Sequence, residues 1–349
     1  LQTALKMAPV YNGPVAKATT AIDTVNLVNR LSDHQACLSL YEEQEAIRRQ
    51  KTENLSLEDY NSLEIEAQNY APYVPVKEGV FTINPMIEEV LPFIDWAYFF
   101  FSLQFYGKYP DLLDNNAEAQ QAFEHAHEML AKIIADKSLS IEARFGVVKA
   151  NNMGDDLIRL SDGSKSVELP MLRRQTKMQD SMSIADTVGR NDYLGVFALT
   201  AGIGLSKLMS EAETPYDALV VKLLADRLTE ATGEYIHYRI RSEYWGFDKS
   251  PFSFDEKQYQ GRRMCFGYPA CPDHSLKQRV FDFLEVEQHT NMRLTDSYMI
   301  TPEESLCGLI TSRGGYFSVG RVDEAQLEHY SKYAGMSVEK LKEILPNNI

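Results

Sequence analysis

The segment from Arg263 to His274 reads Arg263-Met264-Cys265-Phe266-Gly267-Tyr268-Pro269-Ala270-Cys271-Pro272-Asp273-His274. Its two prolines fix the backbone and lack N–H donors, so neighbouring carbonyl and N–H groups stay free to meet a ligand. Gly267 lets the backbone come close to that ligand. The Arg263 guanidinium offers a planar fork for a carboxylate. The segment therefore predicts a rigid, ligand-binding turn.

The composition is that of an ordinary globular protein. The chain has 349 residues, of which 44% are hydrophobic and 24% charged, enough for one large domain or two small ones with a sizeable core. The formal net charge is −15. Nucleic acids and anionic membranes bind basic surfaces, so we expect neither as a partner.

Cysteine usage and hydropathy bear on the compartment. The four cysteines are Cys37, Cys265, Cys271 and Cys307. They are too few for a disulfide scaffold, which favours the cytoplasm. The most apolar stretch, residues 90–106, contains Pro92 and Asp95 and is shorter than a membrane span, so we expect a buried helix. Because the chain begins at Leu1 without Met, we also expect it to be a piece of a longer chain.

Periodicity and capping residues predict a mixture of helices and strands. Helices are expected at 21–31, from 86 through the aromatic run 96–105, and at 117–135, 217–241, 280–289, 324–330 and 338–345. Strands are expected at 143–150, 157–160, 166–169, 193–200, 298–300, 306–311 and 316–322. The charged residues 40–70 suggest a solvated N-terminal helical arm. Without a strict βαβ alternation, the order favours the α+β class.

The Arg263 segment resembles the S-adenosylmethionine-binding activation domain of cobalamin-dependent methionine synthases. The family pattern is Arg-x-x-x-Gly-Tyr followed by Pro-Ala-Cys-Pro, and the chain carries all of it. Other motifs of the family occur upstream of this segment, in the same order as in the family. They include Ile94-Asp95-Trp96, Gly107-Lys108-Tyr109-Pro110, Gly154-Asp155-Asp156, Ala225-Asp226-Arg227-Leu228 and Tyr244-Trp245-Gly246. The matches extend over about residues 90–345, and residues 1–35 are similar to the tail that follows the family's cobalamin-binding module.

The resemblance implies a fold and a function. We expect a linker over residues 1–35 and an activation domain over 36–349, one α+β domain around a twisted antiparallel sheet flanked by helices. Methionine synthases occasionally lose an electron from cobalamin and are rescued by reductive methylation. Flavodoxin or another reductase supplies the electron, and S-adenosylmethionine supplies the methyl group. The domain's task is positioning, so we expect no catalytic side chain and no turnover by this fragment alone.

The resemblance also implies a set of cofactor-binding residues. By carry-over, Asp95 holds the ligand's amino group, Arg263 holds its carboxylate, and Glu230 supports them. The remaining members are Met264, Cys265 and Gly267 through their backbone, Tyr268 beside the adenosine, and the pair Tyr316 and Phe317 near the sulfonium or ribose. Asp226 and His274 are expected toward the cobalamin, which a neighbouring module binds. By its local sequence, Asp95 also suits a helix N-cap.

The chain departs from the family pattern at two places. The family more often has Pro-Ala-Pro where this chain has Met264-Cys265-Phe266, and a second tyrosine where it has Phe317. The lost hydroxyl removes at most a hydrogen bond, about 0.5–1.5 kcal/mol. The first departure leaves an alternative open: a docking module for a flavodoxin-like redox partner with weak or vestigial ligand binding.

Metal centres are a weaker interpretation of the same residues. Cys265, Cys271 and His274 lack a fourth zinc ligand at a suitable spacing. The two Glu-x-x-His units ending at His127 and His237 would suit a di-iron four-helix bundle, but the many strand and proline signals oppose that fold. We therefore expect no metal site.

Overall fold

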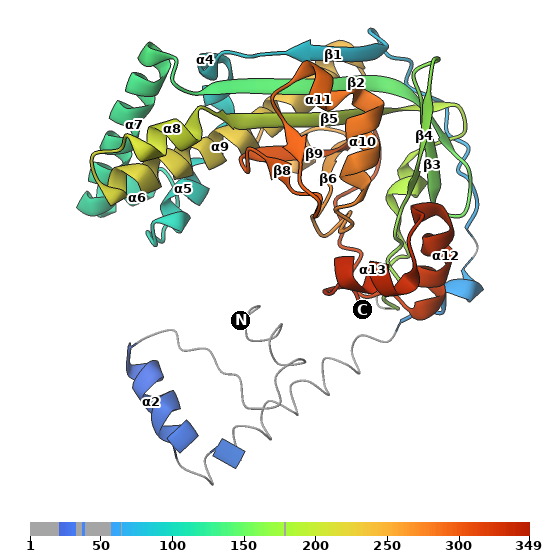
Figure 1. Cartoon of the computed structure of the whole chain (residues 1–349), viewed down its shortest axis with the longest axis horizontal. Coiled ribbons are helices and arrows are strands. Elements are labelled where there is room, and N and C mark those ends of the chain that lie inside the picture. Colours follow the sequence, from blue (N-terminus) through green and yellow to red (C-terminus); the bar gives the residue numbers. More distant parts are fainter. Residues whose placement is uncertain (1–20, 33–36, 39–56, 64, 178) are drawn as a thin grey trace.

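The computed structural model describes residues 21–32, 37–38, 57–63, 65–177 and 179–349 (Figure 1). Its centre is a seven-stranded sheet in which every neighbouring pair is antiparallel. The strands are β1 (Gly79–Ile83), β2 (Ser140–Asn152), β3 (Leu157–Ser161), β4 (Ser166–Pro170), β5 (Asp192–Ile203), β6 (Arg262–Cys265) and β9 (Ser305–Thr311). They lie in the order β4-β3-β2-β5-β9-β6, and β1 pairs with β2.

The rest of the described chain consists of helices, a small pair of strands and irregular connections. The helices are α2 (Ala21–Ser32), α4 (Ile87–Val90), α5 (Trp96–Ser102), α6 (Asp111–Asn115), α7 (Ala117–Asp136), α8 (Leu205–Ser210), α9 (Pro215–Arg239), α10 (Leu276–Leu284), α11 (Val286–His289), α12 (Glu324–Ala334) and α13 (Val338–Ile344). The strands β7 (Arg293–Leu294) and β8 (Ile300–Thr301) form a separate small pair. No helix among the described residues has the length and apolar character needed to cross a bilayer.

Strand alternation divides the core into two clusters, one on each face of the sheet. Along β5, Val196 and Ala198 belong to the cluster beneath α10, α12 and α13, whereas Phe197 and Leu199 belong to the cluster beneath α4 to α9. This period of two is what a strand buried on both faces requires. In Figure 1, β3 and β4 turn away from the direction of β1 and β5, as in a twisted sheet. The predicted α+β fold around an antiparallel sheet is confirmed.

Several predicted boundaries hold because local capping chemistry sets them. Asn116 accepts a hydrogen bond from Ala119 N at 3.0 Å and begins α7. Asp323 and Ser337 cap α12 and α13 in the same way. Each side-chain oxygen satisfies a backbone donor that the first helical turn leaves unpaired. The predicted β-hairpin is also present, with β3 and β4 joined through Asp162 and Gly163.

Three predictions about local structure were wrong. The buried helix expected over residues 90–106 is interrupted, because the 3-10 turn Leu91–Phe93 ends before Asp95 caps α5, and Tyr98 and Phe101 on α5 are each 60% exposed.

Residues 57–63 and 65–70 do not form a solvated helical arm, and residues 39–56 lie outside the described part. The segment contacts the domain instead: Tyr60 is buried, Glu58 N donates to Gln175 O at 2.6 Å, and Arg190 N donates to Gln68 O at 3.0 Å. These tertiary contacts override the weak local helix preference of its charged residues.

Residues 316–322 were expected to form a strand but are irregular. Their burial alternates, with Phe317 and Val319 inside, which produced the strand-like pattern. The backbone bonds, however, go to loops: Val319 N donates to Pro269 O at 2.9 Å and Val322 N to Asn348 O at 2.8 Å.

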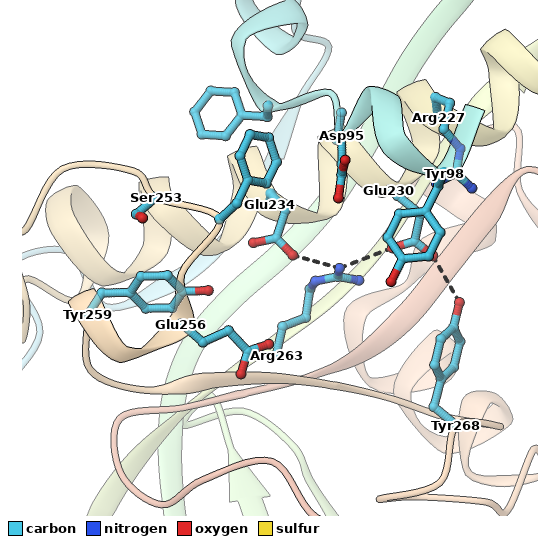
Figure 2. A pocket seen from close by; sticks show the side chains of 13 residues that line it. Asp95, Tyr98, Arg227, Glu230, Glu234, Ser253, Glu256, Tyr259, Arg263 and Tyr268 are labelled. Atoms are coloured by element: carbon cyan, nitrogen blue, oxygen red, sulfur yellow. Dashed lines mark hydrogen bonds and ion pairs between the residues drawn. The ribbon is translucent and has the colours of Figure 1, made fainter. Parts of the chain in front are cut away.

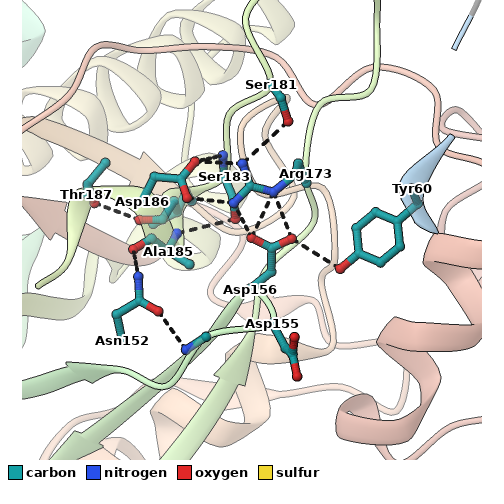
Figure 3. Close-up of polar contacts among 12 residues, drawn as sticks. Tyr60, Asn152, Asp155, Asp156, Arg173, Ser181, Ser183, Ala185, Asp186 and Thr187 are labelled. Atoms are coloured by element: carbon teal, nitrogen blue, oxygen red, sulfur yellow. Dashed lines mark hydrogen bonds and ion pairs between the residues drawn. The ribbon is translucent and has the colours of Figure 1, made fainter. Parts of the chain in front are cut away.

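A buried ion-pair network connects the turn between β2 and β3 to the segment that contains Tyr60 (Figure 3). The Arg173 guanidinium contacts Asp156 at 2.5 Å and Asp186 at 2.6 Å, and the Tyr60 hydroxyl donates to Asp156 at 3.3 Å. Asp156 is only 2% exposed. A buried carboxylate needs such partners, because desolvation without them is costly.

We therefore predict that Arg173→Leu destabilises the domain by about 3–5 kcal/mol, since it leaves Asp156 buried without a cation. Urea denaturation should show a lower midpoint with an unchanged m-value. The control is Arg159→Leu, which removes the exposed pair of Arg159 with Glu168 on the β-hairpin and should cost about 1 kcal/mol or less. Equal midpoints for the two variants would contradict a stabilising role of the network.

Candidate functional site

A cavity of about 420 Å³ lies between α5, α9, the strand β6 and the loop that precedes β6 (Figure 2). It is lined by Phe93, Asp95, Tyr98, Arg227, Glu230, Ala231, Glu234, Ser253, Phe254, Glu256, Tyr259, Arg263 and Tyr268. Four carboxylates and two guanidinium groups face it, so its formal charge is −2. Five aromatic rings make up much of the remaining wall.

Strand alternation places Arg263 in this cavity. Met264 belongs to the cluster beneath α10, and Cys265 belongs to the cluster beneath α9. Arg263, two positions from Cys265, therefore projects toward α9. There Gly233 makes room for it: a Cβ on Gly233 would lie 2.9 Å from the Arg263 Cζ, closer than real Cβ contacts come. The mid-helix glycine thus permits the strand and the helix to enclose a guanidinium.

Arg263 is the centre of the polar contacts, as Figure 2 shows. Its Nη2 donates to Glu230 at 3.0 Å and to Glu234 at 2.8 Å, and its Nη1 donates to the Cys265 Sγ at 3.3 Å. The two glutamates are four residues apart on α9 and so share one face of the helix. A guanidinium has five N–H donors, so Nη1 keeps a second N–H for a ligand.

The charged groups of the cavity shift one another's pKa values. Burial alone would raise the pKa of Glu234, but the neighbouring His237 and Arg263 outweigh it and lower that pKa to about 2. Burial lowers the pKa of His237 and keeps its imidazole neutral. For Arg263, burial is outweighed by Cys265 and the two glutamates, which raise its pKa well above the usual value. Arg263 and Glu234 are therefore both charged at neutral pH.

The turn after β6 supplies the outer wall of the cavity. The Tyr268 hydroxyl donates to Glu230 at 3.0 Å. Gly267 has φ +90°, and a Cβ there would lie 2.2 Å from the Cε1 of His274. The turn is closed by a bond from Gly267 N to Cys271 O at 2.7 Å. Only glycine tolerates both this φ and this close approach, so the geometry explains the glycine of the motif.

Asp95 has two roles in the structure. Its Oδ1 accepts a hydrogen bond from Ala97 N at 3.0 Å and caps α5, as its local sequence suggested. The residue also lines the cavity, opposite the Arg263 ion pairs (Figure 2). A carboxylate keeps further lone pairs after accepting one backbone bond, so capping leaves Asp95 able to accept from a ligand.

The structure gathers some of the predicted site residues and separates others. Asp95, Glu230, Arg263 and Tyr268 line the cavity together. The side chains of Met264, Cys265 and Phe317 are buried in the core, and Gly267 lies in the turn. Tyr316 is 45% exposed and is not among the lining residues. Asp226 pairs with Lys222, and His274 with Lys277, both away from the lining.

Nine lining residues were not predicted as site residues from the sequence. They are Phe93, Tyr98, Arg227, Ala231, Glu234, Ser253, Phe254, Glu256 and Tyr259. Arg227 and Glu234 had a usable signal, because they are three and four positions from Glu230 and so share its helix face. The four residues of the loop before β6 had none, since irregular loops show no periodicity. Among the described residues, no group of three or more His, Cys, Asp or Glu side chains is arranged to hold a metal ion.

The low pKa of Glu234 predicts a pH-dependent stability. The folded-state pKa of about 2 is below the ordinary 4.5, so the stabilisation is present above pH 4.5 and is lost as the pH falls toward 2. Between pH 5 and 2, the free energy of unfolding of the wild type should fall by up to about 3 kcal/mol more than that of Glu234→Gln. The variant has no carboxyl group at this position to protonate. Urea denaturation at several pH values measures this difference. Glu128→Gln, an exposed control on α7, should have the same pH dependence of the free energy of unfolding as the wild type. The same pH dependence in Glu234→Gln would contradict the low pKa of Glu234.

Comparisons with known proteins agree with this geometry. The family model described as "Vitamin B12 dependent methionine synthase, activation domain" matches residues 86–335, which is most of the chain. Among solved structures, the chain is similar to the MetH reactivation domain in a crystal structure with bound AdoHcy. The two are 34% identical, the match covers 85% of this chain and 96% of that chain, and the TM-score is 0.75. The chain therefore belongs to the family of vitamin B12-dependent methionine synthase activation domains.

Proposed function

We propose that the cavity around Arg263 binds S-adenosylmethionine and presents its methyl group for the reductive methylation of cobalamin. The observation that carries the proposal is the combination of a formal charge of −2 with five aromatic rings. S-adenosylmethionine has an ammonium, a sulfonium and one carboxylate, so its net charge is positive. Acidic side chains favour such a cation, and aromatic faces suit its adenine. The AdoHcy in the related structure supports a ligand of the same class.

The residues have complementary roles in this proposal. Asp95 accepts hydrogen bonds from the ligand's ammonium, Arg263 donates its remaining Nη1 hydrogen to the carboxylate, and Glu230 supports the Arg263 side chain. Tyr268 packs beside the adenosine. Because the side chains of Met264 and Cys265 are buried, their segment and Gly267 would meet the ligand through backbone atoms only. The substitution of Met264-Cys265-Phe266 for the family's Pro-Ala-Pro is then compatible with binding.

Tyr316 and Phe317 have unequal places in the proposal. Tyr316 is 45% exposed and can approach a ligand that extends beyond the lined cavity. Phe317 is 5% exposed and packs in the core, so it would act by holding the Tyr316 backbone.

The methyl acceptor would be cobalamin held by a neighbouring module of the same enzyme. Cobalt supplies the nucleophile once a flavodoxin or another reductase has delivered an electron, and S-adenosylhomocysteine is the by-product. The domain then needs no general base, and its contribution is orientation. Exposed aromatic residues near the cavity suit contact with a partner: Tyr98, Phe101 and Tyr106 are each at least 60% exposed. We place the linker at residues 1–35, the domain at 36–349, and the enzyme in the cytoplasm.

Calorimetric titration of S-adenosylmethionine tests the proposal. The wild type should bind one equivalent of S-adenosylmethionine. Arg263→Ala should raise the dissociation constant at least about tenfold, because a charged hydrogen bond is lost. Asp95→Asn should weaken it similarly while the helix stays capped, because asparagine and aspartate cap about equally well. Arg159→Ala, on the distant β-hairpin, is the control and should bind like the wild type.

The absence of saturable binding by the wild type would contradict the proposal and favour the docking-module alternative. Unchanged binding by both Arg263→Ala and Asp95→Asn would place the ligand elsewhere on the domain.

A second experiment separates binding from turnover. The domain alone, with S-adenosylmethionine and a reductant, should produce no S-adenosylhomocysteine. Adding a cobalamin-loaded methionine synthase module should start its production, measured by chromatography, and Arg263→Ala should lower the rate at subsaturating ligand. Production by the domain alone would show that it contains a methyl acceptor of its own, against the proposal.

A further inference from the structure

One wall of the cavity is built by a loop with little regular structure. Residues 247–260, here called the wall loop, connect the end of the α9 segment to β6 and contain one short 3-10 turn, Glu256–Gln258. The loop gives Ser253, Phe254, Glu256 and Tyr259 to the cavity. Because it supplies four of the thirteen lining residues, its position sets the shape of the cavity.

Glycines stand at both ends of the wall loop. Gly246 and Gly261 each have φ +83°, a backbone conformation that other residues rarely adopt. A Cβ on Gly246 would lie 2.8 Å from the Val76 Cγ2, and a Cβ on Gly261 would lie 2.4 Å from the Thr311 carbonyl oxygen. The loop therefore begins and ends at two glycines whose backbone lies close to a neighbouring segment, and the residues between them depend on other contacts for their position.

Arg241 lies directly behind this loop and is only 1% exposed. It belongs to η4 (Ile240–Tyr244), a π-helical turn that continues α9, in which Trp245 N donates to Ile240 O at 2.7 Å. A π-turn inserts one extra residue into the helical repeat and often occurs beside functional sites. A fully buried arginine is also rare and requires compensating contacts.

The contacts of Arg241 all go to the wall loop or to the helix that carries it. Nη2 donates to Pro251 O at 3.1 Å, and the guanidinium carbon lies 4.7 Å from the centroid of the Tyr259 ring. Nη1 lies 3.4 Å from the Asp248 carboxylate, which itself accepts from Gln260 N at 2.5 Å. One buried side chain thus touches the beginning, the middle and the end of the loop.

We propose that Arg241 is a positioning residue that holds the wall loop in place, so that Tyr259 and its neighbours form the ligand-facing wall of the cavity. Arg241 itself is not among the lining residues and acts through Tyr259 and the loop backbone. Its effect on ligand binding rests on the proposed function, whereas its effect on the loop does not.

The first test measures the loop without ligand. In Arg241→Lys, which keeps a cation but loses the planar fork, amide hydrogen exchange over residues 247–260 should become at least about tenfold faster, with β2 and β5 unchanged. Asp248→Asn should accelerate the same peptides and serves if Arg241→Lys does not fold. Arg159→Lys is the matched control. Exchange equal to wild type in folded Arg241→Lys or Asp248→Asn would overturn the proposal.

The second test connects the loop to ligand binding. Arg241→Lys should raise the dissociation constant for S-adenosylmethionine about tenfold, mainly through faster dissociation. In a Tyr259→Ala background, the same substitution should raise the dissociation constant by a smaller factor, because the part of its effect that acts through Tyr259 is gone. Equal effects of Arg241→Lys in both backgrounds would indicate general destabilisation and would overturn the positioning role.

The two tests also separate this inference from the proposed function. Failure of the wild type to bind S-adenosylmethionine would contradict the proposed function, and the exchange rates would still decide whether Arg241 holds the loop. Normal binding by wild type and by folded Arg241→Lys alike would contradict this inference alone.

Discussion

The arginine enclosed between strand β6 and helix α9 is the constraint on which the site depends. The Arg263 side chain is only 14% exposed, so its charge must be paired, and Glu230 and Glu234 provide the pairing from a single helix face. The pairing requires three independent conditions: strand alternation that directs Arg263 toward α9, a four-residue spacing of the glutamates, and space at Gly233. The strand alternation and the four-residue spacing follow directly from regular secondary structure.

Regular and irregular segments contribute different groups to the cavity around this ion pair. Strand β6 and helix α9 belong to the core of the sheet and set the positions of the charged groups. The Gly267 turn and the wall loop add three of the five aromatic rings, Tyr268, Phe254 and Tyr259. A buried cationic residue contacts each segment or its neighbour: Lys277 contacts His274, and Arg241 contacts Tyr259. Binding residues placed on loops that a rigid scaffold supports are a common arrangement.

Much of this architecture was predictable from the sequence, and the failures have physical causes. Caps such as Asn116, Asp323 and Ser337 act locally, so the helices that they begin were predicted correctly. The burial of Tyr60 depends on Asp156, about a hundred positions away, and no local pattern reports such a contact. For the cavity, the motif indicated Arg263 and Tyr268. Tyr259 and Glu256 were missed because their loop has no periodicity and is placed by tertiary contacts alone.

Gly233 has a consequence for the tolerance of this fold to substitution. Judged by helix propensity, a glycine in the interior of a 25-residue helix is unfavourable, and alanine would be expected to stabilise the helix by about 1 kcal/mol. Here the methyl group of alanine would be forced against the guanidinium and would displace it from its carboxylates. The helix therefore carries a permanent local weakness so that a charge can be enclosed beside it. A search for stabilising mutations guided by secondary structure alone would choose this position early and would damage the site.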